Sequence, residues 1–176
     1  MNARRQGLVR VMIRPGGVFQ VALLVLLYVL LGNARSVQPN PFIPGDIIAV
    51  NMVIPVLSGI LFGRQAGLLV GLLGTSLNTI TPAGSLFELL SILPHGTMGW
   101  VAGHFRHRVP TPILACSLVV GHGLNILMYV LFGVLPFASL LHTTFWYGLA
   151  YETFAGVIAV TILAGIYRLG VQPIQA

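Results

Sequence analysis

Residues 21–27 read Val21-Ala22-Leu23-Leu24-Val25-Leu26-Leu27, an unbroken apolar run inside a stretch of 20 residues without a charge, from Pro15 to Ala34. A helix needs about 20 apolar residues to cross the hydrocarbon core of a bilayer. A membrane β-barrel would instead alternate apolar and polar residues along strands of about ten residues. Because the run is continuous, we predict a membrane-spanning helix. Its length favours a retained span over a cleaved signal peptide.

The whole chain has the composition of a membrane protein. Of its 176 residues, 56% are apolar and only 7% are charged, whereas soluble domains carry about 25% charged residues. All nine basic residues are Arg, and a Walker A loop needs a Lys, so any ATP-driven step requires a partner. The arginines lie singly or in pairs between apolar runs, which argues against a nucleic-acid partner. We predict an all-α integral membrane protein in the lipid bilayer.

Charges and turn residues divide the chain into six predicted spans, which form one transmembrane domain over residues 1–176. The predicted helices cover residues 17–33, 47–63, 65–80, 85–104, 112–132 and 144–168. With both termini in the cytoplasm, eight of the nine arginines fall on the inside and only Arg35 on the outside. This distribution follows the positive-inside rule and supports an even number of spans.

Three pairs of glycines recur at a spacing of four residues. They are Gly59 and Gly63, Gly67 and Gly71, and Gly99 and Gly103. Small faces of this kind let helices approach closely in a membrane. They predict tight packing inside the bundle or, alternatively, a docking surface for another membrane subunit.

Polar side chains inside a bilayer cost free energy and therefore need a reason. In the predicted topology the polar residues of five helices fall in the outer half of the membrane, and the inner halves are nearly all apolar or small. A channel would need polar lining through its full depth, so we expect an outward-facing binding chamber. The candidate substrate-binding residues are Asn51, Asn78, Glu88, His95, His122, Asn125, Tyr129, Trp146, Tyr147, Tyr151 and Glu152.

Several of these candidates also have a purely structural interpretation. Trp146 and Tyr147 fit an interfacial aromatic belt. Glu152 shares its helix face with small residues, which predicts a helix-packing face and an interhelical hydrogen bond. His95 and His122 would satisfy each other if they bonded across the bundle. Both interpretations stay open on the sequence alone.

Two segments carry a family resemblance. Residues 54–67 read Ile-Pro-Val-Leu-Ser-Gly-Ile-Leu-Phe-Gly-Arg-Gln-Ala-Gly, and residues 96–103 read Gly-Thr-Met-Gly-Trp-Val-Ala-Gly. With the size and topology of the chain, they resemble the substrate-binding S components of energy-coupling factor (ECF) vitamin transporters. The resemblance implies a receptor for a vitamin-like small molecule, without a cofactor or catalytic residues, in the cell membrane of a prokaryote. It also implies a transmembrane coupling protein and ABC-type ATPases as partners.

The ligand is less clearly indicated than the family. Carboxylates and aromatic faces both favour cations, so a cationic heterocycle such as thiamine or its pyrimidine precursor is one expectation. A transition metal is an alternative, although the nickel and cobalt members carry a His directly after Met1, where this chain has Asn2. A structural membrane subunit is another. An intramembrane hydrolase is a fourth, but Ser58 lies at a different depth from the two central histidines, so no nucleophile–base pair is evident.

Overall fold

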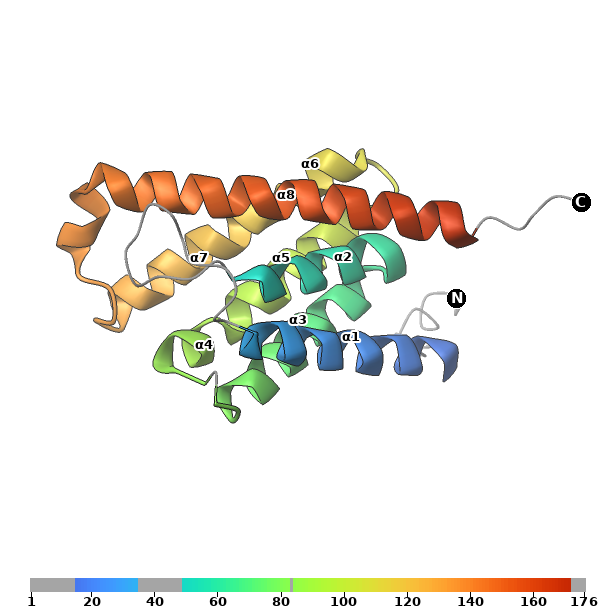
Figure 1. The fold of residues 1–176 in the computed structure, drawn as a ribbon, viewed down its shortest axis with the longest axis horizontal. Coiled ribbons are helices and arrows are strands. Elements are labelled where there is room, and N and C mark those ends of the chain that lie inside the picture. Colours follow the sequence, from blue (N-terminus) through green and yellow to red (C-terminus); the bar gives the residue numbers. More distant parts are fainter. Residues whose placement is uncertain (1–14, 35–48, 83, 172–176) are drawn as a thin grey trace, which may run out of the picture.

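The computed structural model describes residues 15–34, 49–82 and 84–171 (Figure 1). These residues contain helices and no strand, which confirms the predicted all-α class. The elements in chain order are α1 (Pro15–Asn33), η2 (Val50–Met52), α2 (Val53–Phe62), α3 (Arg64–Thr79), α4 (Leu86–Leu90), α5 (Ile92–Phe105), α6 (Thr111–Ala115), α7 (Ser117–Leu131), η3 (Phe137–Leu141) and α8 (Thr143–Val171).

Most of the predicted helix boundaries agree with these elements within a few residues. Two predicted helices are interrupted: residues 85–104 become α4 and α5, and residues 112–132 become α6 and α7. Pro94 explains the first interruption, at Ser91, because its ring clashes with the carbonyl of Leu90 four residues earlier and it lacks an N–H. The predicted helix 47–63 starts instead as η2 and becomes α-helical at Val53.

Two helical stretches are long and apolar enough to cross a membrane by themselves, Thr111–Leu131 and Thr143–Gly170. Gly17–Asn33 and Val50–Phe62 are shorter apolar helices. At about 1.5 Å per residue, the 29 residues of α8 extend about 43 Å, more than the hydrocarbon core requires. The count of six spans stays a prediction.

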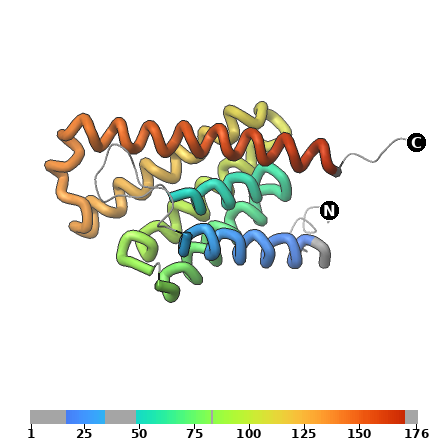
Figure 2. The backbone as a smooth tube through the Cα atoms, viewed as in Figure 1, coloured from blue at the N-terminus to red at the C-terminus, as the bar shows by residue number. Residues whose placement is uncertain are grey.

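The chain runs back and forth along the long axis of the bundle (Figure 2), so the start of α1 and the end of α8 lie toward the same end. The described arginines lie at this end too. A guanidinium nitrogen of Arg106 donates to the carbonyl of Leu61 at 3.3 Å, beside the α2–α3 turn. Arg168 donates to Thr111, at the start of α6, at 2.9 Å. The N-terminal arginines and Arg35 lie outside the described residues.

Helix α2 lies at the centre of the bundle. All residues from Val53 to Ile60 are buried, as expected for a helix that is apolar on every face. One side packs with α5, α6, α7 and α8 around Val56, Met98 and Leu118. Its other side packs with α1 and α3, where Ile54 meets a second cluster that includes Val70.

Helices α2, α3 and α5 touch at their backbones through glycines. A methyl group on Gly59 or Gly67 would collide with the carbonyl oxygen of Gly99, and one on Gly71 would collide with the carbonyl oxygen of His95. The turn between α2 and α3 requires Gly63, whose φ is +100°. Of the two readings of the glycine pairs, the structure therefore shows packing inside the bundle.

We expect Gly99→Ala to lower the stability of the protein by about 1–3 kcal/mol, because the added methyl group must push α3 away from α5. Thermal unfolding of the detergent-solubilised protein measures the change. Gly123→Ala and Gly165→Ala are matched controls, since a methyl group there meets nothing within 4 Å and improves helix propensity. Equal melting temperatures for all three variants would contradict the role of the glycine contacts.

Candidate functional site

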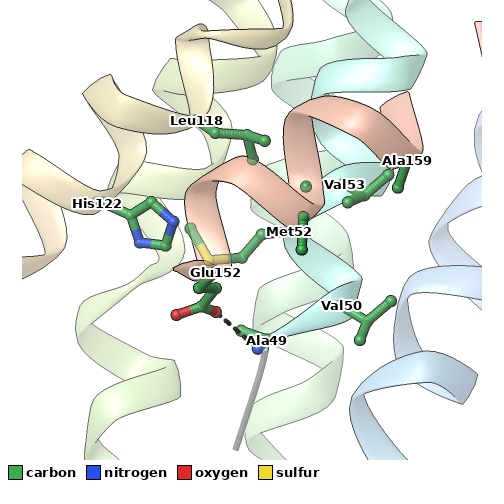
Figure 3. Close-up of a pocket in the computed structure, with 10 residues that line it drawn as sticks. Ala49, Val50, Met52, Val53, Leu118, His122, Glu152 and Ala159 are labelled. Carbon is green, nitrogen blue, oxygen red and sulfur yellow. Dashed lines mark hydrogen bonds between the residues drawn. The ribbon is translucent and has the colours of Figure 1, made fainter. Parts of the chain in front are cut away.

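A cavity of about 250 Å³ lies between the start of α2, α7 and α8 (Figure 3). Its polar lining consists of the imidazole of His122 and the carboxylate of Glu152, which come from α7 and α8. Binding pockets are typically apolar with a few placed polar groups, and this cavity has that character. The rest of its lining is Ala49, Val50, Met52, Val53, Leu118, Ala155, Gly156 and Ala159.

Glu152 joins two walls of the cavity. One of its carboxylate oxygens accepts a hydrogen bond from the backbone N–H of Ala49 at 2.7 Å (Figure 3). Ala49 precedes η2 and supplies no side-chain cap, so this carboxylate from a distant helix satisfies a donor at the start of η2. The carboxylate thereby holds η2 against α8 and lines the cavity with negative charge.

Small residues on α8 make room for the cavity. A methyl group on Gly156 would lie 2.7 Å from a terminal carbon of Leu118, so this glycine lets α7 approach α8. Ala155 and Ala159 line the cavity beside it. The small-residue face predicted for helix packing therefore serves two purposes, since it admits Leu118 and leaves space next to Glu152.

A second group of polar residues lies deeper, between α1, α3, α5 and α7. The buried ring of His95 has its Nδ1 2.6 Å from the Tyr28 hydroxyl and 3.0 Å from the Thr75 hydroxyl. Its Nε2 lies 3.4 Å from the amide nitrogen of Asn125. These partners occupy both ring nitrogens, so the alternative in which His95 bonds His122 is not found.

Donors and acceptors in this group can be assigned from their chemistry. The Thr75 hydroxyl donates to the carbonyl of Gly71 at 2.7 Å, and a hydroxyl has only one proton to donate. The amide of Asn125 can only donate to Nε2 of His95, which places the ring proton on Nδ1. His95 then donates to Tyr28, whose hydroxyl lies 3.0 Å from that of Thr75. This chain of bonds ties α1 to α7 through His95.

Some buried polar atoms have no hydrogen-bond partner among the described residues. The Asn125 oxygen and the Asn51 amide nitrogen are examples, in side chains that are 5% and 3% exposed. Asn125 lies one helical turn after His122 on α7, and Asn51 lies between two cavity residues, Val50 and Met52. Buried polar atoms are normally satisfied by protein, water or ligand, and neither of these two residues is part of the cavity lining.

Other predicted site residues form separate groups near the opposite end from the arginines. The Asn78 oxygen accepts hydrogen bonds from Asn33 at 3.2 Å and from Thr81 at 3.3 Å, which joins the ends of α1 and α3. The hydroxyl of Tyr129 bonds that of Ser91 across α7 and α5. These bonds satisfy polar tips that would otherwise be costly inside a bilayer.

The remaining candidates lie outside the cavity lining. Trp146, Tyr147 and Tyr151 on α8 are 49%, 65% and 41% exposed, and the Trp146 indole donates to the carbonyl of Leu140 at 2.7 Å. Glu88 is half-buried in α4. The eleven candidates thus divide among several groups, of which the cavity holds His122 and Glu152.

Sequence reasoning missed Tyr28 as part of the polar core. The available signal was a single phenol within an otherwise aliphatic run, from Leu23 to Leu31. A buried Tyr hydroxyl almost always finds a partner, so this residue pointed to a polar contact for α1. Periodicity could not say which helix supplies that partner.

We expect Tyr28→Phe to lower the free energy of unfolding by about 1–3 kcal/mol, because the change leaves polar atoms of His95 and Thr75 without the phenol. Thermal unfolding in detergent measures it. Tyr167→Phe removes the same atom from a side chain that is 37% exposed and is the matched control. A loss that is equally small in both variants would mean that the buried bonds contribute little.

A family model for the S component of the ECF-type riboflavin transporter matches residues 15–169, which include every described helix over most or all of its length. No curated protein and no solved structure matches the chain significantly. S components are integral membrane proteins that bind the transported vitamin and work with a membrane coupling protein and ATPases, and they are not enzymes. The resemblance found in the sequence is thereby confirmed, and the chain belongs to the family of ECF-type riboflavin transporter S components.

Proposed function

We propose that this chain captures riboflavin from outside the cell and holds it at the cavity between η2, α7 and α8. The family match over residues 15–169 carries the proposal. The cavity supports it, because it is the place where a carboxylate, an imidazole and an apolar wall come together. At about 250 Å³ it is slightly smaller than most ligand pockets.

The chemistry of a flavin fits this lining. The ring system is flat and uncharged, with a methylated benzenoid edge and an edge that carries an imide N–H between two carbonyl groups. Val50, Val53 and Leu118 would cover the apolar edge. The carboxylate of Glu152 would accept the imide N–H, and His122 would meet a ring carbonyl or nitrogen.

Riboflavin replaces the cationic heterocycle expected from the sequence. That expectation combined carboxylates with aromatic faces, but Trp146, Tyr147 and Tyr151 are exposed on α8 and do not line the cavity. The family description names riboflavin as the transported vitamin. A carboxylate in an apolar lining can also accept a hydrogen bond from the N–H group of a neutral ligand.

The alternative functions gain no support from the described residues. The Ser58 hydroxyl is buried and has no hydrogen-bond partner among them, so it has no base to activate it. No group of three or more His, Cys, Asp or Glu side chains within the described ranges could hold a metal ion.

The proposed topology has six spans with both termini in the cytoplasm. The placement of Arg64, Arg106, Arg108 and Arg168 at one end supports it, because arginines are enriched on the cytoplasmic side. The opposite end, where η2 and the start of α8 lie, would then face outward. The cytoplasmic end would work with a coupling protein and two ABC-type ATPases.

Binding of riboflavin to the purified protein, followed by quenching of flavin fluorescence, tests the proposed site. We expect Glu152→Gln to raise the Kd about 10- to 100-fold, because the charged acceptor becomes a neutral amide, which forms a weaker hydrogen bond. Glu88→Gln removes the same charge outside the cavity lining and should leave the Kd unchanged. Excess thiamine should not compete with riboflavin for binding.

Ala155→Leu provides a second variant that leaves every charge in place. The larger side chain would fill part of the cavity, so riboflavin affinity should fall while thermal stability is retained. Loss of binding in Glu88→Gln together with normal binding in Glu152→Gln would move the site to α4. Competition by thiamine would instead indicate that the site takes a cationic heterocycle.

Cysteine labelling in whole cells tests the topology. The exposed Cys116 is first replaced by Ala, and single cysteines are then introduced as His142→Cys and Arg106→Cys. A membrane-impermeant thiol reagent should label the first from outside and the second only after permeabilisation. Labelling in the reverse pattern would invert the proposed orientation.

A further inference from the structure

Three arginines gather where α2, α3 and α5 end or begin. The Arg106 guanidinium packs on Gly63 in the α2–α3 turn, and a methyl group there would lie 3.1 Å from one of its nitrogens. Arg64 directly follows that turn, and its backbone packs against Gly103 of α5. Arg108 lies two residues beyond Arg106, and the side chains of Arg64 and Arg108 are exposed. The guanidinium of Arg106 therefore packs on this turn, and Arg64 and Arg108 lie close to it in the chain.

The described residues do not balance this charge. They contain two carboxylates, Glu88 in α4 and Glu152 near the cavity, and both lie toward the other end of the bundle (Figure 1). Arg106 uses one nitrogen on the Leu61 carbonyl and its Nε on His107 at 2.8 Å. Since a guanidinium has five N–H donors, further donors remain for an anion.

Exposed aromatic side chains lie next to the arginines on α5. Trp100 and Phe105 are 38% and 40% exposed, and the ring of His104 stacks on Trp100 with centroids 5.0 Å apart. Amphipathic rings of this kind are typical of the level at which lipid headgroups meet acyl chains. The last two turns of α5 thus carry exposed rings in the residues just before Arg106 in the chain.

We propose that this surface, formed by Arg64, Arg106, Arg108, Trp100 and Phe105, is a binding site for an anionic phospholipid. The headgroup phosphate lies among the guanidinium groups, whose planar donors match phosphate oxygens. The acyl chains run along Trp100 and Phe105. Bound in this way, the lipid bridges the α2–α3 turn and the end of α5, and it neutralises the cations that α2, α3 and α5 hold close together.

Thermal unfolding in detergent micelles, with added dioleoylphosphatidylglycerol or dioleoylphosphatidylcholine, tests the proposal. Phosphatidylglycerol should raise the melting temperature well above the value with phosphatidylcholine. We expect Arg64→Gln and Arg108→Gln each to weaken apparent phosphatidylglycerol affinity about fivefold, the effect typical of one arginine near an anionic surface. The comparison of the two lipids within each variant removes any change in intrinsic stability.

Arg168→Gln is the matched control, because it removes one positive charge from the same end but bonds Thr111 instead. It should retain the protection that phosphatidylglycerol gives. Equal protection by both lipids, as expected if an acidic protein surface is the true partner, would overturn the proposal. So would equal loss of protection in all three variants, which indicates net charge alone, or the same protection by inorganic phosphate, which indicates a free anion.

Discussion

Backbone contact between α5 and the α2–α3 hairpin is the constraint on which the rest of the molecule depends. Lipid provides no hydrophobic drive between helices, so close packing and hydrogen bonds must hold the bundle together. Gly59, Gly67 and Gly99 remove the side chains that would keep these three helices apart. Gly71 does the same beside His95, which sets the depth of the central imidazole and brings it within reach of α1 and α7.

The polar residues follow from the same requirement. With no water in the hydrocarbon region, each polar tip needs a partner from another helix, and the described residues provide them in small groups. Tyr28, Thr75, His95 and Asn125 connect four helices, and Asn33, Asn78 and Thr81 connect two. A few buried polar atoms have no hydrogen-bond partner among the described residues, and these include the Asn125 oxygen, the Asn51 amide nitrogen and the Ser58 hydroxyl.

The two ends of the bundle have different chemistry. One has Glu152, His122 and the small face of α8, which suit a mainly neutral ligand with a hydrogen-bond donor. The other has the arginines and exposed aromatic residues of α5. Helices α2 and α5 pass between these ends, so the same backbone contacts support both the proposed vitamin site and the proposed lipid site.

The sequence by itself determined the class of protein, the approximate helices and the family. Apolar run length and charge placement are local properties, and the bilayer constrains them strongly. The glycine spacings also predicted where helices approach closely. The effect of Pro94 was overlooked, because its clash falls on a carbonyl a turn earlier.

Only the tertiary structure decided which polar groups meet. Periodicity places Glu88, His95 and Ser91 on one face of a helix, but it cannot say what that face opposes. The fold brings His95 to Tyr28 and Asn125, whereas Glu152 meets Ala49 from 103 positions away. The rotation of a helix about its axis and the identity of the helices it packs against depend on packing over the whole bundle. The residue pattern of a single helix specifies neither property. For that reason the membrane class could be predicted with its approximate helices, while the division of eleven candidates into separate groups could not.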